Sequence, residues 1–535
     1  MDQLAKTSDE DLNSVQLVAY HFWQTTRRYL TGFDRSTGVL AFVAPTRHSY
    51  AGLKAGARYY LENALAFLDA PGEWYLSRTG KLYYRPRPGE DLAKATVVAP
   101  RLSTLFAFKG AAGHFIEYLS FQGLSFRYSQ WITPPDGVFP DQSAFSIHAA
   151  VMADGVRHVS LENCEISHTG KYALWFRNGC SNVIVRHCLF QDLGGGGIRV
   201  GGMTLPADGA QRTSNVEVDN NIICHGGRIF PSAVGIWIGT SSDNKITHND
   251  VSDFYSTGIS IGWQWGYAAS SASGNRIDFN HIHHLGWGLL SDLGGIYTLG
   301  MSPGTECNGN VIHDIRAGDY GGWGIYFDEG SSQILAENNL VYATTHGGFH
   351  QHYGRENLVR NNIFALNRDA QLQLTLSEPH LSLTFEHNII YWQKGELFAY
   401  EWGRADIQSD YNLFFQASTS ESRFDNKSLL ASEPQGRDLH SQVADPGFRK
   451  PASGDFTLPV NSPAFQVGFK PFDYQQAGVY GTEEWRRLAE TLSGRLCPIG
   501  WSTIHSPPGE GFVSMRERCP LNTRSSAERG SATRF

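Results

Sequence analysis

A short pattern of apolar residues around one asparagine recurs through the middle of the chain. In each copy, an apolar residue is followed three positions later by Asn, and another apolar residue follows two positions after that. Copies are separated by 23 to 31 residues, a period typical of repeat proteins whose units pack on their neighbours. The copies contain Asn221, Asn249, Asn280, Asn310, Asn338, Asn361, Asn388 and Asn412.

The residues between the asparagines indicate the architecture. Short β-branched runs broken by Gly, such as 197–200 and 234–238, recur between the copies, whereas a leucine ladder and paired amphipathic helices are missing from the pattern. Three short strands and three turns fit a unit of about 28 residues. We therefore predict an all-β fold, a right-handed parallel β-helix of the pectin-lyase-like kind with about ten coils, over residues 101–481.

A tight, inward-facing turn explains the preference for asparagine. A buried amide can donate to a carbonyl of the next coil and so satisfy turn backbone that a core would leave unpaired. Cys164 and Cys188 fit the same column in two upstream copies. We expect them to be buried small residues rather than a catalytic pair.

The rest of the composition excludes several function classes. Apolar residues make up 41% of the 535 and charged residues 18%, which is enough for an ordered core. The net charge of −8, without a basic patch, argues against nucleic-acid binding, and no stretch approaches the ~18 apolar residues of a membrane span. Seven scattered cysteines do not form a disulfide framework. We expect a monomer without a cofactor.

The two ends of the chain do not carry the repeat. Residues 1–100 are predicted to form a small β-rich domain in which 72–76 and 81–84 are paired strands. Residues 482–535 are predicted to begin with a short helix and continue as a disordered tail rich in Ser, Arg and Gly. The first residues include an acidic cluster where a signal peptide would have an apolar core, so we expect no export signal.

Several longer motifs carry a resemblance to a known family. They are YLEN at 60–63 with APGEWYL at 70–76, DLGGIYTLG at 292–300, GGWGIYFDEGSS at 321–332, GGFHQHYGRENLVRNNIF at 347–364 and KPFDYQQAGVYG at 470–481. Together they resemble glycoside hydrolase family 141, whose members are right-handed β-helix enzymes with fucosidase and xylanase activities. The first pair resembles the insertion domain of that family, and the resemblance covers about residues 15–490.

The resemblance has consequences for location and completeness. It implies an extracellular or periplasmic protein that acts on a polysaccharide or oligosaccharide. Family members ordinarily begin with a signal peptide and initial coils before the insertion domain. This sequence starts within the insertion, so we expect an N-terminally truncated chain.

Strand periodicity predicts which side chains face outward. Side chains alternate along a strand, so one face of a β-helix can display residues from successive coils. The Gly-Ile register aligns Ile259, Ile296, Ile325 and Phe349, which we expect to point inward. The outward positions then include Ser260, Tyr297, Tyr326, Asp328, His350 and His352.

This outward constellation suits glycoside hydrolysis. The reaction needs two carboxyl groups across the scissile bond, one as proton donor and one as nucleophile or base. By resemblance, the acidic pair of the family falls on Asp292 and Asp328, with Glu329 a rival for the second role. We expect substrate contacts from rings and polar side chains: Trp263, Trp265, Tyr297, Tyr326, His350, His352 and Arg355. Because both aspartates are expected on the solvent face, their Asn variants should stay folded.

Each of these features also fits a structural role. Asp292 precedes two glycines and Asp328 lies in an Asp-Glu-Gly turn motif, so either carboxylate could stabilise a turn. Histidines at 346, 350 and 352 raise the alternative of a zinc site, because two of them lie at alternate strand positions. The sequence does not establish a third ligand with fitting geometry, and we expect no metal. The histidines at 281, 283 and 284 are expected to lie in a solvated turn.

Two other functions remain open. A polysaccharide lyase or epimerase can share this architecture and often uses Lys or Arg as a base. Between residues 110 and 400 the only lysines are Lys171, Lys245 and Lys394, none near the acidic residues, whereas Arg355 is a candidate base. A non-catalytic glycan-binding protein is the third alternative. We favour a glycoside hydrolase of the fucosidase or xylanase type.

Overall fold

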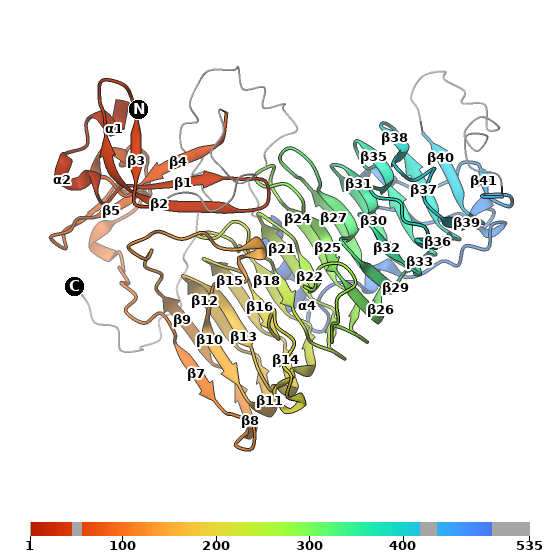
Figure 1. The fold of residues 1–535 in the computed structure, drawn as a ribbon, viewed down its shortest axis with the longest axis horizontal. Coiled ribbons are helices and arrows are strands. Elements are labelled where there is room, and N and C mark those ends of the chain that lie inside the picture. The colour runs from red at the N-terminus through yellow and green to blue at the C-terminus, as the bar shows by residue number, and fades with distance from the viewer. Residues whose placement is uncertain (1, 45–55, 418–435, 495–535) are drawn as a thin grey trace.

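The computed structural model describes residues 2–44, 56–417 and 436–494 and contains a long parallel β solenoid (Figure 1). The predicted disordered tail therefore lies outside the described residues. Three parallel sheets run along the solenoid, and each strand pairs with the equivalent strand one coil later. The predicted all-β parallel β-helix is confirmed.

Eleven strands form the first sheet. They are β7 (Phe106–Lys109), β10 (Ala149–Asp154), β13 (Tyr172–Phe176), β16 (Ile198–Val200), β19 (Ile236–Ile238), β22 (Ile259–Gly262), β25 (Gly294–Leu299), β28 (Trp323–Phe327), β31 (Gly347–Gln351), β35 (Ala370–Leu374) and β38 (Glu396–Tyr400).

Twelve strands form the second sheet. They are β8 (Ile116–Gln122), β11 (Val156–Glu162), β14 (Ser181–Arg186), β17 (Ser214–Asp219), β20 (Lys245–Thr247), β23 (Arg276–Asp278), β26 (Met301–Asn308), β29 (Ser331–Glu337), β32 (Gly354–Arg355), β33 (Asn357–Arg360), β36 (Leu383–Glu386) and β39 (Ile407–Asp410).

Another twelve strands form the third sheet. They are β9 (Ser125–Ser129), β12 (Glu165–Thr169), β15 (Leu189–Leu193), β18 (Ile222–Cys224), β21 (Asp250–Phe254), β24 (His281–Leu285), β27 (Val311–Ile315), β30 (Leu340–Thr344), β34 (Ile363–Ala365), β37 (Ile389–Trp392), β40 (Leu413–Gln416) and β41 (Gln442–Val443).

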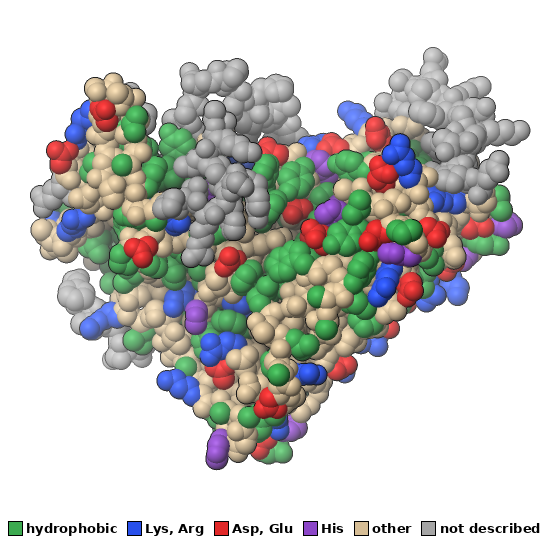
Figure 2. Space-filling model, in the orientation of Figure 1, with side chains coloured by type: hydrophobic (Ala, Val, Ile, Leu, Met, Phe, Trp, Pro, Cys, Tyr) green, Lys and Arg blue, Asp and Glu red, His purple; other side chains and the backbone are tan. Residues whose placement is uncertain are grey.

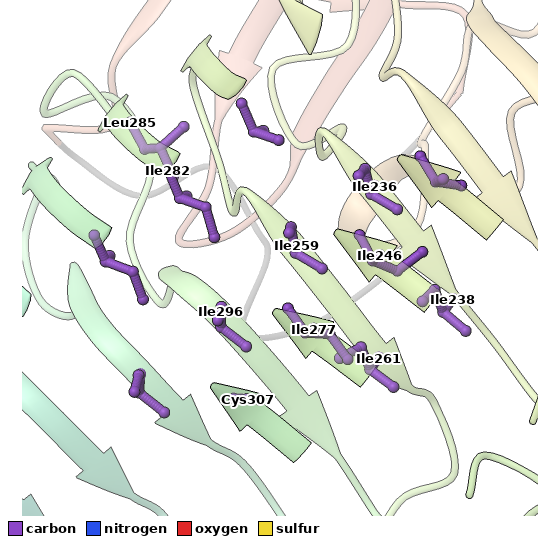
Figure 3. Packing of buried hydrophobic residues seen from close by; sticks show 14 of the residues in the cluster. Ile236, Ile238, Ile246, Ile259, Ile261, Ile277, Ile282, Leu285, Ile296 and Cys307 are labelled. Atoms are coloured by element: carbon purple, nitrogen blue, oxygen red, sulfur yellow. The ribbon is translucent and has the colours of Figure 1, made fainter. Parts of the chain in front are cut away.

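The space enclosed by the three sheets is filled with aliphatic and aromatic side chains. Ile259, Ile296 and Ile325 are fully buried there in adjacent strands, and Phe349 continues the same row, as the alternation predicts. Figure 3 shows part of this packing, with isoleucines from neighbouring coils stacked on one another. Because each coil buries its apolar side chains against the next, the core is continuous along the solenoid.

An asparagine ladder lines the turn between the second and third sheets. The Asn310 side-chain amide donates to Oδ1 of Asn339 at 2.9 Å, and Asn339 donates to Asn362 at 2.9 Å. The sequence pattern wrongly assigned these two rungs to Asn338 and Asn361. Those neighbours have positive φ angles of 54° and turn the chain just before the inward-facing residue.

The N-terminal region forms an antiparallel sheet of β3 (Leu40–Phe42), β2 (Thr25–Phe33), β1 (Gln16–Tyr20) and β4 (Tyr59–Glu62). Two short helices, α1 (Asp2–Ala5) and α2 (Asp9–Leu12), precede it. The predicted pairing near 72–84 is confirmed, because β5 (Trp74–Leu76) and β6 (Leu82–Tyr84) form an antiparallel pair. Figure 1 shows the turn between β1 and β2 reaching toward the middle of the solenoid.

The described C-terminal region packs on the outside of the third sheet. Helix α4 (Glu483–Gly494) buries Trp485, Ala489 and Leu492 against Ile222 and Cys224 of β18. The short helix expected after 482 is therefore present, while the division of the chain at residues 100 and 481 stays a prediction. Among the described residues, no helix is long and apolar enough to cross a membrane.

Candidate active site

One column of outward-facing residues crosses the first sheet. Ser260, Tyr297, Tyr326 and His350 are register partners in β22, β25, β28 and β31. We expected this face to be solvent-exposed, but these four side chains are each 3% exposed or less. Phe145, Met203 and Tyr320, which lie outside these strands, pack against the aromatic residues of the column. Figure 2 shows acidic and histidine side chains on the upper part of this face of the molecule.

Asp292 lies in the loop that leads into β25. Its backbone has a φ of 60°, a left-handed conformation that aspartate tolerates better than most residues. The Asp292 amide donates to the carbonyl of Tyr320 at 3.1 Å. This approach requires Gly321, because a Cβ at that position would lie 2.7 Å from the Asp292 nitrogen. The neighbouring coil thus fixes the backbone that carries the carboxyl group.

The Asp292 carboxyl group lies in an environment that favours its protonated form. Burial raises the pKa of Asp292 to about 7, and the nearby carboxylate of Asp328 adds to the rise. The Tyr326 hydroxyl donates to Oδ1 of Asp292 at 3.0 Å, which opposes the shift in pKa. A carboxyl group with this pKa can donate a proton near neutral pH.

Asp328 follows β28 directly and is held by donors from two neighbouring coils. Its Oδ2 accepts from the Tyr297 hydroxyl at 2.5 Å, and Nδ1 of His352 lies 3.0 Å from its Oδ1. The residue is only 6% exposed, so the expectation of a solvent-facing carboxylate is wrong for Asp328. The rings of Tyr297 and Tyr326 cross edge to face at 5.1 Å and connect the two carboxyl groups through their hydroxyls.

His350 in β31 and His352 just after it have pKa values shifted in opposite directions. Burial lowers the pKa of His350, whose Nε2 lies 2.7 Å from the Thr375 hydroxyl. Burial also opposes protonation of His352, but its hydrogen bond with Asp328 and the carboxylates nearby raise its pKa overall. His352 therefore forms an ion pair with Asp328 whenever it is protonated.

A second acidic group lies beside this pair. Glu329 accepts from the Tyr353 hydroxyl at 3.1 Å, and the Tyr353 ring lies 6.1 Å from that of Tyr267. Tyr267 in turn donates to Glu378. The guanidinium of Arg355 lies over the Tyr267 ring at 4.8 Å. Arg355 therefore faces this tyrosine and glutamate cluster.

The two predicted tryptophan platforms have different environments. Trp263 is fully buried, and its indole N–H donates to the Ser260 hydroxyl at 3.1 Å. Its ring packs against Tyr297 and is not available to stack on a sugar. Trp263 therefore has a packing role beside the column rather than the predicted role in substrate contact. Trp265 is 45% exposed and packs edge to face on Trp263. Of the two, only Trp265 offers an exposed ring face.

The N-terminal sheet contributes to the rim near Asp292. The Ser291 amide donates to the Phe22 carbonyl at 2.7 Å, and the rings of Phe22 and Tyr320 lie 5.9 Å apart. Arg58 donates to the carbonyl of Gly288 at 2.8 Å and also to that of Leu289. The loop that carries Asp292 is therefore held between its own coil and the N-terminal sheet.

Among the described residues, three groups of side chains have metal-ligating chemistry, and one of them lies at this site. Asp328, Glu329 and His352 offer donor atoms within 4.8 Å of one another. His346 does not join them: it lies 3.5 Å from Asp369 in the next coil. The histidines expected in a solvated turn instead belong to β24, where His283 is 2% exposed.

Several residues of the site escaped the sequence analysis. Tyr320, Tyr353, Tyr267 and Glu378 lie between strands, and Gln142 begins the short 3-10 helix η3 (Gln142–Ala144); none of these segments follows the repeat. The side-chain amide of Gln142 lies 3.5 Å from the Tyr297 hydroxyl, although 155 residues separate them. Of these residues, only Tyr353 could have been identified from the sequence, because it directly follows the candidate residue His352.

Comparison with known protein families supports the right-handed β-helix fold and the resemblance to glycoside hydrolase family 141. The family described as right handed beta helix region matches residues 149–320 and 210–414. The GH141 insertion domain matches residues 45–87, part of which lies outside the described residues. No curated protein matches the sequence.

Several solved structures are similar to this chain. A glycoside hydrolase is 25% identical with a TM-score of 0.61, and the match covers 66% of this chain and 68% of that one. The complex of XylC with xylose matches at 15% identity and a TM-score of 0.36, covering 62% and 54% of the two chains. The periplasmic alginate epimerase AlgG matches at 10% identity and a TM-score of 0.33, covering 55% of this chain and 69% of that one.

Proposed function

We propose that this right-handed parallel β-helix protein, which carries a GH141 insertion domain, is a glycoside hydrolase that uses Asp292 and Asp328 as its pair of carboxyl groups. The observation that carries the proposal is the difference between the two environments. Burial keeps Asp292 protonated up to about neutral pH, whereas Asp328 accepts hydrogen bonds from Tyr297 and His352. Pairs of carboxyl groups with different environments divide the roles of acid and base or nucleophile.

In this proposal Asp292 is the general acid. It protonates the oxygen of the leaving group as the glycosidic bond breaks. Asp328 is the nucleophile, or the base that activates water, and stabilises the positive charge that develops on the sugar ring. Glu329 lies next to Asp328 but binds Tyr353, so we assign it to substrate binding rather than to either chemical step.

The substrate is proposed to be a neutral or acidic oligosaccharide or polysaccharide, with fucosides and xylosides as the first candidates. The exposed ring of Trp265 can stack on a sugar face, and Arg355 and His352 can donate to hydroxyl or carboxylate oxygens. By family resemblance we propose that the enzyme acts outside the cytoplasm.

The function is tested with aryl fucosides, xylosides and galactosides and with pectic fragments as substrates. Hydrolysis produces new reducing ends, whereas a lyase produces an unsaturated sugar that absorbs in the ultraviolet. We expect reducing ends without that absorbance, in the presence of a chelator as in its absence. An unsaturated product would make the protein a lyase, and saturable glycan binding without turnover would make it a binding protein.

The pH dependence of the reaction should have an alkaline limb that belongs to Asp292. Because its pKa is raised to about 7, the acid is lost as the pH rises through that value, so kcat/KM should fall above pH 7.

Folding stability should change in the same direction. The folded state holds this proton more tightly than the unfolded state. The contribution of the proton to the free energy of unfolding is therefore fully present below pH ~4 and declines as the pH rises toward 7. Urea unfolding of the wild-type protein and Asp292→Asn between pH 4 and 8 measures this decline, which the variant should lack.

A further inference from the structure

Four polar side chains meet on the outer face of the third sheet, away from the carboxyl pair. Asp250 lies in β21, His281 and His283 lie in β24, and His313 lies in β27. Strand register places Asp250 beside His281 and His283 beside His313. In β24, Ile282 points into the core, as Figure 3 shows, so His281 and His283 on either side of it face outward.

The nitrogen and oxygen atoms of this group are close together. Nε2 of His281 lies 2.9 Å from Nε2 of His313. Oδ2 of Asp250 lies 3.0 Å from Nδ1 of His281 and 3.3 Å from Nε2 of His283. The three histidines each offer a donor atom within 4.8 Å of the others. Two ligands about 2.0–2.1 Å from a tetrahedral zinc ion lie about 3.3 Å apart, so only small adjustments separate this arrangement from a binding site.

Hydrogen bonding to carboxylates determines which imidazole nitrogens remain as acceptors. Nδ1 of His313 lies 2.7 Å from Asp314, and Nδ1 of His281 faces Asp250. A neutral imidazole carries one proton, and the carboxylates draw it to Nδ1 in both rings. The two Nε2 lone pairs then face each other at 2.9 Å, which is repulsive unless a proton or a metal ion lies between them. Carboxylates that fix the tautomer of ligating histidines are a regular feature of zinc sites.

An independent observation also indicates a cation. Asp250 is 4% exposed, and its Oδ1 has no hydrogen-bond partner among the described residues. A buried carboxylate oxygen without a partner costs free energy unless a cation or donor satisfies it. The site is nevertheless reachable from solvent, because the side chain of His281 is 31% exposed.

We propose that His281, His283 and His313, with Asp250 as fourth ligand or as the residue that orients them, bind one divalent transition-metal ion of the zinc class. Imidazole nitrogens with one carboxylate are the ligand set that zinc favours, whereas calcium and magnesium favour oxygen. The ion joins β21, β24 and β27 and therefore ties three successive coils together. It stabilises the solenoid and takes no part in the proposed hydrolysis.

The test is metal titration of the full chain after treatment with a chelator. Zinc binding is measured by calorimetry, and cobalt binding by its visible absorption, which is intense when four ligands surround the ion. We expect one ion per chain and an increase in Tm with zinc. His281→Gln and His313→Gln should each weaken binding at least tenfold. His158→Gln, an exposed histidine of another coil, is the matched control and should bind as the wild type does.

His352→Gln separates this site from the group around Asp328 and should keep the zinc affinity. Loss of binding in His352→Gln with full binding in both site variants would place the ion at the carboxyl pair and overturn the proposal. Absence of stoichiometric binding by the wild-type protein would show that the histidines form only a hydrogen-bonded stack, and would also overturn it. Should the site variants fail to fold, the cobalt spectrum of the wild type decides: weak, octahedral-type absorption contradicts the proposed ligands.

Discussion

Asp328→Asn and Asp292→Asn should each reduce kcat/KM about 10³-fold or more, because each removes one of the two carboxyl groups that the reaction needs. Asn has nearly the shape of Asp and can still accept from Tyr297 or Tyr326. The solenoid should therefore remain folded, which circular dichroism and Tm would verify. Asp319→Asn, an exposed aspartate near the Asp292 loop, is the matched control and should keep wild-type activity.

The two variants should differ in their response to the leaving group. An acidic aryl leaving group departs without protonation, so it should rescue Asp292→Asn by at least about tenfold relative to a poor leaving group. Asp328→Asn should show no such rescue, because its loss affects the attack on the sugar. Wild-type rates in both variants would remove the pair from the mechanism, and rescue of Asp328→Asn alone would exchange the two roles.

Asn339→Ala should be one of the most destabilising single changes in the solenoid, lowering the free energy of unfolding by about 3–5 kcal/mol. The Asn339 amide donates to the Cys307 carbonyl at 2.8 Å and to Asn362 at 2.9 Å. Its Oδ1 accepts from both the backbone and the side chain of Asn310. Alanine leaves these buried groups without partners, and each unpaired group costs about 1–3 kcal/mol.

The adjacent Asn338→Ala provides the matched control. Asn338 donates to Asn308 at 2.9 Å and accepts from Asn361 at 2.7 Å on the outer side of the turn, where water can replace the lost bonds. We expect a loss of about 1 kcal/mol, mostly from its left-handed backbone conformation. Urea unfolding followed by tryptophan fluorescence measures both. Equal losses for the two variants would mean that the inner ladder does not hold the turns.

The fold could be predicted from the sequence because each coil repeats one local rule. Alternating apolar positions predicted the inward-facing side chains, which include Ile259 and Ile296. The recurring asparagine predicted where each coil turns. The error at Asn338 and Asn361 arose because another asparagine follows each of them. The local pattern fits either residue, and only the left-handed backbone of the first decides which side chain points inward.

The candidate site was less predictable because it depends on loops. Periodicity identified Tyr297, Tyr326, Asp328 and His350 as outward residues of successive coils, and the structure brings them together. It could not show that this face is covered. The covering segments around residues 142, 265 and 320 have no repeat, and their contacts join parts of the chain far apart in sequence.

The contacts of Arg58 have a consequence for the order of folding. Arg58 binds the carbonyls of Gly288 and Leu289, which follow it by 230 and 231 residues. During synthesis the N-terminal sheet emerges long before those carbonyls exist, so it cannot dock until the coil that contains them has formed. Contacts of such long range form late because closing a large loop costs entropy. A ribosome-bound fragment that ends before residue 288 would therefore lack these contacts, and the loop that carries Asp292 would be anchored to the N-terminal region only after its own coil has formed.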